Sequence, residues 1–164
     1  MEEKAFEKIS VKDICEKCTM NRKSFYYHFK DKYDLVNWIF DTEFLSIAHK
    51  TPDPDIWDFL NDICPFFYEN RDFYQKALCI KGQNSFPDHF RDLLFPIIAN
   101  RIHAVFGKKE VLDFQLTFIT DAVVMAFQRW IVDYDEMTPE DFIHQIKLSI
   151  RYITIQYGDM DETL

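Results

Sequence analysis

The sequence predicts an all-α protein with an N-terminal helix-turn-helix head and a C-terminal helical bundle. Apolar residues recur at helical spacing along the chain, and Ser, Thr, Asn or Asp residues precede several of these patterns as N-caps. The 164 residues include only three glycines, which disfavours barrels, Gly-rich phosphate loops and all-β folds. We expect a head with a linking helix over residues 1–50 and a body over residues 51–164, divided at the Thr-Pro-Asp-Pro segment 51–54.

Residues 10–32 predict two short helices joined by a tight turn. The first helix begins at its N-cap Ser10 and carries an apolar stripe formed by Val11, Ile14, Cys15 and Cys18. Asn21 caps the second helix, in which Phe25 and Phe29 share one face. Two short helices with a polar outer face are typical of a helix-turn-helix whose second helix enters a DNA major groove.

The run from Ser24 to Lys32, which reads SFYYHFKDK, resembles the signature of TetR-family transcriptional regulators. The resemblance covers Ile9 to about Leu35, and residues 25–38 look like regulators of the dihydroxyacetone-kinase operon type. It implies a regulator, usually a repressor, that binds a pseudo-palindromic operator as a homodimer. It also implies control by a small-molecule effector or partner at the body, with activation through a protein co-regulator as the alternative.

Two features depart from the family pattern. TetR-type heads have a full first helix, whereas only its last turns precede Ser10 here, with Phe6 and Ile9 as the apolar contacts. We expect a start at an internal methionine or a trimmed chain, with a natural variant as the alternative. Many family members have glycine where Thr19 stands, because a left-handed residue suits a helix end, so with threonine we expect a turn that is either slightly different or strained.

The charge is distributed unevenly along the chain, whose net charge is −9. Residues 1–50 contain nine basic and nine acidic residues, whereas residues 51–164 contain ten and nineteen. Within residues 17–32, five basic residues oppose one acidic residue, so we expect any DNA contact there. No apolar run is long enough to span a membrane and no signal peptide opens the chain, so we expect a cytoplasmic protein.

The outer face of the second helix supplies the predicted DNA contacts. Lys23, Ser24 and Tyr27 are expected to face base edges. Asn21 and Arg22 are expected at the start of the helix, where Arg22 can pair with a guanine. The predicted phosphate contacts are Lys12, Tyr26, His28 and Lys32. The alternative is a packed aromatic hinge flanked by solvated lysines.

The rest of the chain also reads as helices. The linking helix is predicted from Lys32 to about His49, with an inward face of Leu35, Trp38, Ile39 and Thr42. The body helices are predicted over residues 56–68, 73–80, 87–106, 110–134 and 138–157. Pro65 is expected to kink or end its helix, and Pro96 is expected to kink its helix.

The body contains most of the seventeen Phe and eight Tyr residues, more than a small core needs. One use would be a pocket for an aromatic or apolar effector, with the candidate lining Phe66, Phe67, Phe73, Phe90, His103, Phe114 and Phe118. The alternative is simple core packing.

The last two helices are apolar around much of their circumference, which indicates a central position or a partner surface. We expect a four-helix dimer interface formed by Val123, Phe127, Trp130, Ile143, Ile146, Ile150, Ile153 and Tyr157.

Catalysis finds little support in the sequence. The five His residues lack metal-ligand spacing, and neither a phosphate loop nor a nucleophile elbow is present. Cys15 and Cys18 have half the spacing of a zinc site and are interpreted as core thiols. We therefore expect no enzyme, no cofactor and no metal. The rival to a regulator is a helical interaction module that dimerises without binding DNA.

Overall fold

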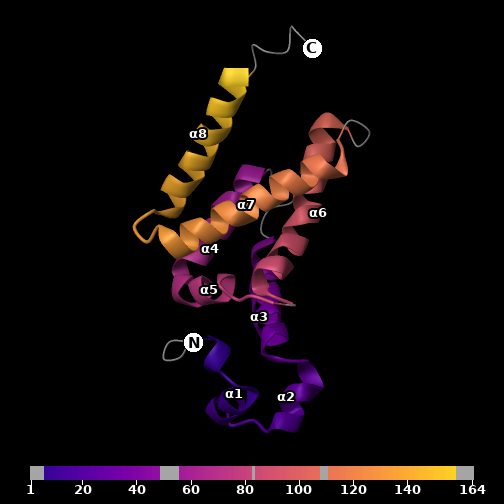
Figure 1. Cartoon of the computed structure of the whole chain (residues 1–164), viewed down its shortest axis with the longest axis vertical. Helices are drawn as coiled ribbons and strands as arrows, with labels where there is room; N and C mark the ends of the chain where they lie inside the picture. Colours follow the sequence, from indigo (N-terminus) through magenta and orange to yellow (C-terminus); the bar gives the residue numbers. More distant parts are fainter. Residues whose placement is uncertain (1–5, 49–55, 83, 108–110, 158–164) are drawn as a thin grey trace.

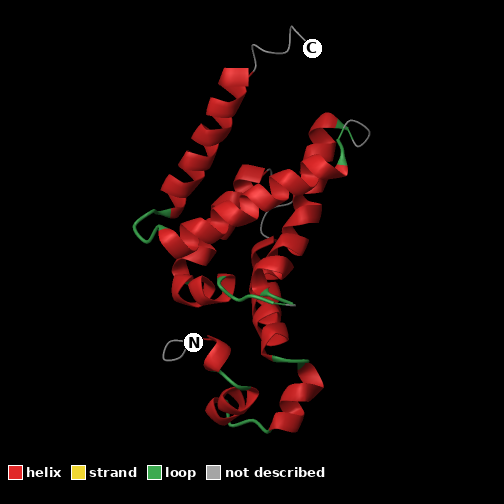
Figure 2. Ribbon diagram, in the orientation of Figure 1, coloured by secondary structure: helices red, strands yellow, loops and turns green. Residues whose placement is uncertain are grey.

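The computed structural model describes residues 6–48, 56–82, 84–107 and 111–157, and every regular element in these ranges is a helix (Figure 2). A single-turn helix, η1 (Phe6–Lys8), is followed by α1 (Val11–Lys17) and α2 (Arg22–His28), which form the head. The linking helix α3 (Lys32–Ala48) rises from the head into the body (Figure 1). The prediction of an all-α fold with an N-terminal helix-turn-helix is confirmed.

The body consists of five helices that follow the predicted pattern closely. They are α4 (Ile56–Glu69), α5 (Arg71–Leu78), α6 (Phe86–Phe106), α7 (Asp113–Asp133) and α8 (Pro139–Tyr157). Pro65 lies inside α4 and Pro96 inside α6, and neither ends its helix. The expected boundary at residues 51–54 lies outside the described residues, so the division into head and body stays a prediction. No helix in the described part of the chain is long and apolar enough to cross a membrane.

An aromatic core joins α3 to the body. The Phe40 ring is fully buried, and its centroid lies 5.2 Å from that of Phe86, 5.6 Å from Phe90 and 5.8 Å from Phe67. Edge-on arrangements of this kind use the quadrupoles of the rings as well as their apolar area. The core thus forms where α3 meets α4 and α6.

The predicted inward face of α3 is wrong. The buried face carries Val36, Phe40 and Phe44, whereas Trp38 is 53% exposed and Thr42 is also exposed. The helix bears large apolar residues on both faces, so its periodicity did not identify the side that meets the body.

Two polar contacts reinforce the attachment of α3. His89 Nε2 on α6 lies 2.6 Å from Asp41 Oδ1, and the Tyr74 hydroxyl on α5 donates a hydrogen bond to Glu43 Oε2 at 3.0 Å. Both acceptors lie on the body half of α3. The head is therefore connected to the body through a helix that is anchored along one side.

The turn between α7 and α8 is fixed by side chains that satisfy the end of α7. Arg71 donates to the carbonyl oxygens of Trp130 and Ile131 in the last turn of α7 and to that of Asp135 just beyond the helix. The Trp130 ring stacks on Phe142 of α8 with centroids 4.3 Å apart. Beyond this contact α8 diverges from α7 (Figure 1) and packs against α4.

Alkaline pH should reveal the Tyr74–Glu43 contact. Burial and the neighbouring Glu43 carboxylate raise the pKa of the Tyr74 hydroxyl above its ordinary value of 10.0. An unfolded chain would ionise this group near pH 10 while the folded chain would not, so its stabilising contribution is present below pH 10 and lost above it. We expect Tyr74→Phe to reduce the loss of unfolding free energy above about pH 10, measured by urea denaturation across pH. Tyr134→Phe, at a half-exposed tyrosine, is the control, and equal pH slopes in the two variants would contradict the expectation.

Candidate nucleic-acid interface

The helices of the head begin where capping side chains place them. Asp13 N–H donates to Ser10 Oγ at 3.2 Å, and Ser10 N–H donates to Asp13 Oδ2 at 2.8 Å, which completes a capping box on α1. Asn21 Oδ1 accepts the N–H of Ser24 at 2.8 Å and caps α2. Asp31 accepts two backbone N–H groups and starts α3. These caps fix where the three helices begin, and each joins residues two or three apart in sequence.

The two faces of α2 differ sharply in burial. Phe25 is 2% exposed and its ring lies 5.4 Å from that of Phe29, which in turn meets Trp38 of α3 at 5.5 Å. On the outer face Tyr27 is 85% exposed, and Lys23 is exposed as well. The aromatic side of α2 thus packs towards α3, and the side that is predicted to read bases is exposed to solvent.

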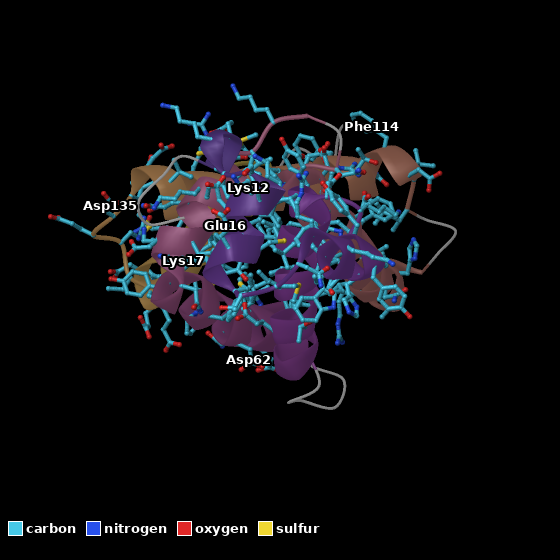
Figure 3. The ribbon with its side chains drawn as sticks, turned by 90° about the horizontal axis from the view of Figure 1, so that it is seen from below. Lys12, Glu16, Lys17, Asp62, Phe114 and Asp135 are labelled. Atoms are coloured by element: carbon cyan, nitrogen blue, oxygen red, sulfur yellow. The ribbon has the colours of Figure 1, made fainter. Side chains whose placement is uncertain are left out.

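The other predicted contact residues surround this face. Arg22, Tyr26 and His28 are exposed on α2, and Ser24 is half-buried with its hydroxyl bonded to Asn21. Lys12 on α1 is exposed and pairs with Glu16 at 3.6 Å. Seen from below, α1 with Lys12, Glu16 and Lys17 lies in front of the body (Figure 3). The predicted residues therefore gather at one end of the molecule, with the exception of Lys32.

Lys32 requires a correction. Its ammonium group donates to the carbonyl oxygens of Phe6, Glu7 and Ile9 at 2.7, 3.1 and 2.9 Å. These three bonds use all the donors of a lysine. The ammonium also lies 4.5 Å from the centre of the Phe6 ring. Lys32 thus ties the N-terminal segment to α3 instead of standing free for phosphate.

The turn between α1 and α2 contains a left-handed residue, which is the strained alternative of the two considered above. Thr19 has φ +54°, and Met20 N–H closes the turn on the Cys15 carbonyl at 2.9 Å. Cys15 is buried as predicted, whereas Cys18 is exposed, so the interpretation as core thiols holds for Cys15 only. No group of His, Cys, Asp or Glu residues in the described ranges could hold a metal ion.

The predicted effector pocket is not assembled. Phe67 and Phe90 are fully buried and pack ring against ring at 5.2 Å, with Phe66 and Phe73 beside them. Phe114 and Phe118 are instead 76% and 65% exposed on the far side of α7, and His103 is half-buried on α6. The aromatic abundance that suggested a pocket serves the core, which is the alternative considered above.

The predicted dimer residues are also divided by the structure. Phe127, Trp130 and Ile143 are buried within the chain and cannot form an outer surface, while Val123 and Ile146 are partly buried against the core. Ile150 is 48% exposed, and the side chains of Ile153 and Tyr157 lie outside the described residues. Because α7 and α8 are apolar around much of their circumference, sequence periodicity could not tell which side of each helix packs inside the chain and which side is exposed.

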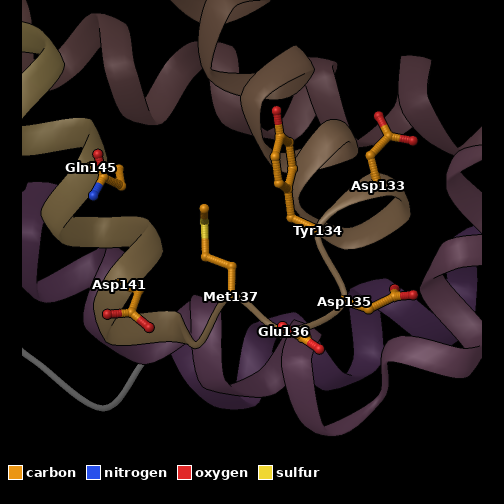
Figure 4. A pocket seen from close by; sticks show the side chains of 7 residues that line it. All are labelled: Asp133, Tyr134, Asp135, Glu136, Met137, Asp141 and Gln145. Carbon is orange, nitrogen blue, oxygen red and sulfur yellow. The ribbon is translucent and has the colours of Figure 1, made fainter.

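The described residues of the body line two hollows that bear on function. A groove of about 250 Å³ lies between α4, α6, α7 and α8, and sequence reasoning missed it because its residues come from four separate helices. The second hollow, of about 570 Å³, lies at the turn between α7 and α8 (Figure 4). The second is lined by Tyr134, Met137, Gln145 and four acidic residues, Asp133, Asp135, Glu136 and Asp141. Its carboxylates disfavour an anionic ligand.

Comparison with known proteins decides the family. Residues 1–39 match the description "Bacterial regulatory proteins, tetR family", and residues 55–152 match "Transcriptional regulator C-terminal region". The second match alone covers more than half of the chain. The chain belongs to the tetR family of transcriptional regulators. Proteins of this family are transcriptional regulators, and the residues of this chain that match its N-terminal description contain the helix-turn-helix formed by α1 and α2.

Two relatives of this tetR-family chain are named for the same operon. It is 32% identical over 81 residues to the HTH-type dhaKLM operon transcriptional activator DhaS of Lactococcus lactis subsp. lactis (strain IL1403). That match covers 49% of this chain and 43% of the relative, so it spans less than half of the relative's length. A solved structure of the dihydroxyacetone kinase operon activator DhaS covers 94% of this chain and 89% of its own, with 22% identity and a TM-score of 0.59. The second likeness shows a shared fold.

Replacing Thr19 should stabilise the head. A residue with a Cβ in the left-handed region costs roughly 1–2 kcal/mol, and a β-branched one is poorly suited to it. We expect Thr19→Gly to raise the unfolding free energy by up to about 1 kcal/mol, since part of the relief is offset by glycine's greater chain entropy. Asn84 has φ +61° but is a residue type that tolerates this region, so Asn84→Gly should gain less. Equal effects in urea denaturation would contradict the assignment of strain to Thr19.

Proposed function

We propose that the chain binds a pseudo-palindromic DNA operator as a homodimer and places α2 of each copy in a major groove. The observation that carries this proposal is the difference between the two faces of α2. Lys23 is exposed and Tyr27 is 85% exposed on the outer face, whereas Phe25 is buried on the inner face. Lys23, Ser24 and Tyr27 would meet base edges, and Arg22 would approach the groove from the start of the helix.

Charge supports this orientation. The segment 17–32 has four more basic than acidic residues, whereas residues 51–164 have nine more acidic than basic residues. Phosphate would attract the head and repel the body, which favours approach by α1 and α2. Lys12, Tyr26 and His28 remain the proposed phosphate contacts, while Lys32 is left out because its donors are used within the chain. A chromosomal target places the protein in the cytoplasm.

A new candidate surface replaces the predicted dimer face. Phe114, Phe118 and Met125 of α7 are 76%, 65% and 49% exposed and lie along one stripe of the helix. Tyr152 of α8 is 66% exposed. The exposed apolar stripe of α7, together with Tyr152 of α8, supports a two-fold contact in which the same surface of both copies is buried.

The sign of regulation has two candidates. The family resemblance favours repression, which an effector or partner at the body would relieve by shifting the spacing of the two heads. The similarity to DhaS, which is named an operon activator, favours activation, and a protein co-regulator would then act on the body. Expression of a reporter fused to the bound promoter, with and without the chain, separates the two.

Removing side chains from the outer face of α2 should weaken DNA binding. We expect Tyr27→Ala to reduce affinity for the operator about tenfold or more, and Lys23→Ala to reduce it and to lower the magnitude of the salt slope by about 1. The measurement is fluorescence anisotropy with a duplex from the region upstream of the gene, across a salt series. Both side chains are exposed, so the fold should be unaffected.

Lys81→Ala is the matched control, because it removes an exposed lysine from the body. Its affinity and salt slope should equal those of the native chain. If the native chain and all three variants are equally inert towards DNA, the interaction-module alternative gains support and the proposal fails.

A charge in the middle of the α7 stripe should disrupt the dimer. Phe118→Asp places a carboxylate where two copies would meet, at a site that is open to solvent in the single chain. We expect a shift from dimer to monomer in sedimentation at micromolar concentration, with weaker binding to a two-half-site operator. Met20→Asp, at an exposed methionine of the head, should leave the mass unchanged. A native chain that sediments as a monomer would exclude the proposed dimer.

A further inference from the structure

Two cysteine thiols at the end of α1 differ in their exposure to solvent. Cys15 is 4% exposed, whereas Cys18, three residues later, is exposed. Residues three apart in a helix lie on the same side, so both thiols belong to the side of α1 that packs inside the head. Cys18 is the C-cap residue, and at this end the packed side opens to solvent. A buried thiol thus lies one helical turn from a thiol that dissolved molecules can reach.

The surroundings of the pair favour thiol chemistry over metal binding. A zinc site uses three or four protein ligands. No group of three or more His, Cys, Asp or Glu residues in the described part of the chain could hold a metal ion. The two other cysteines belong to the body, where Cys64 is buried in α4 and Cys79 is exposed at the end of α5. Oxidation to a disulfide needs only two thiols and an oxidant, and Cys15 and Cys18 supply the thiols.

Helix geometry brings the two residues close to the spacing of a disulfide. Three residues apart in a helix, Cα atoms are about 5 Å from each other, within the range of roughly 4.4–6.8 Å that disulfides span. The corresponding Cβ atoms are roughly 5–6 Å apart, whereas a disulfide requires about 3.5–4.5 Å. One residue must therefore move by about 1–2 Å. Cys15 is held in the packed interior of the head, so Cys18 is the residue that moves.

This movement acts on the strained turn between α1 and α2, at the outer end of the head (Figure 1). The residue after Cys18 is Thr19, which has φ +54°. Met20 N–H then donates to the carbonyl oxygen of Cys15 at 2.9 Å. Drawing Cys18 towards Cys15 displaces Thr19 and Met20, which connect α1 to Asn21, the N-cap of α2. The position of α2 against α1 would change with them.

We propose that Cys18 is an oxidation site for hydroperoxides and that Cys15 completes the reaction by forming a Cys15–Cys18 disulfide. With hydrogen peroxide, the Cys18 sulfur attacks one oxygen, the O–O bond breaks, and Cys18 sulfenic acid and water are formed. The Cys15 sulfur then attacks the Cys18 sulfur, and the hydroxyl group leaves as water with the proton of the Cys15 thiol. In total the two thiols lose two electrons and two protons, and the peroxide is reduced to two molecules of water.

The consequence of this disulfide for regulation rests on the proposed function. Lys23 and Tyr27, the proposed base-reading residues, lie on α2, which directly follows the turn. A disulfide that shifts α2 against α1 would therefore lower operator affinity. The displacement that the bond requires makes it strained, and strained, exposed disulfides are the ones that thiols reduce readily. Reduction would restore the turn and the affinity.

The first test follows the disulfide itself in the full chain with Cys79→Ser, which removes the exposed thiol of the body. Trypsin cuts after Lys17, between the two cysteines, so a Cys15–Cys18 disulfide joins peptides 13–17 and 18–22. After hydrogen peroxide we expect this linked pair, in a chain that keeps the mass of a monomer less two hydrogens, and its loss with dithiothreitol. Absence of the linked pair, or its presence only in covalent dimers, overturns the proposal.

Cys64 is an internal control in the same samples. Burial, and to a lesser extent the Glu140 carboxylate, raises the pKa of the Cys64 thiol, so we expect it to stay reduced. Oxidation of Cys64 as fast as Cys18 would mean that the reaction is not selective and would overturn the assignment of the site.

Matched variants connect the disulfide to DNA binding. In the Cys79→Ser chain, oxidation should lower operator affinity about tenfold or more, and dithiothreitol should restore it. Adding Cys18→Ser, at an exposed site, should leave the affinity of the reduced chain unchanged and make it insensitive to peroxide. Adding Cys15→Ala should stop the reaction at Cys18 sulfenic acid, which dimedone traps. If Cys15→Ala fails to fold by circular dichroism, Cys18→Ser alone decides, and loss of affinity in the oxidised Cys18→Ser chain overturns the assignment.

Hydrogen exchange separates this inference from the proposed function. Loss of the Met20–Cys15 hydrogen bond should speed amide exchange in residues 19–25 about tenfold on oxidation, but not with Cys18→Ser. A chain that forms the linked pair and exchanges faster, yet binds no DNA in either state, supports the inference and refutes the proposed function. Unchanged exchange, or equal DNA affinity in the reduced and disulfide-bonded chains that bind DNA, overturns the inference alone.

Discussion

The packing of the buried Phe40 ring against its aromatic neighbours holds the linking helix α3 on the body. This ring is the point at which the helix leaving the head enters the aromatic core, and its neighbours come from α3, α4, α5 and α6. Burial of a phenylalanine ring contributes roughly 1.5–3 kcal/mol, and several such rings share this core. Because the rings touch one another, none of the four helices can shift without changing the packing of the others.

The head follows a different principle. It is small, and its geometry comes from capping side chains, one left-handed residue and a lysine that satisfies three carbonyl groups. The caps join residues three apart in sequence, whereas the Lys32 bonds join residues 23 to 26 apart. The starts of the helices therefore come from local chemistry, while the attachment of the N-terminal segment depends on a contact between distant parts of the sequence.

This difference explains what the sequence could predict. The caps at Ser10, Asn21 and Asp31 and the outer face of α2 were readable because they depend on near neighbours. The buried side of α3 was not readable, since Leu35 and Ile39 are as apolar as Val36 and Phe40. For the same reason Phe127 and Trp130 were predicted to lie in the dimer interface, whereas they are buried in the core of the single chain. The groove has no local signature, because it is a property of four packed helices.

The anchoring of α3 along one side has a mechanical consequence. From Phe40 to the start of the helix at Lys32 is eight residues, or roughly 12 Å along the axis. The helix is held by Phe40, Phe44 and the Asp41–His89 contact on the body side, and the buried Val36 continues this face towards the head, so a tilt of the helix would carry the head with it. A tilt of about 5° at Phe40 displaces the head by about 1 Å over this length. Changes in the body that are too small to break any contact would thereby move the exposed outer face of α2.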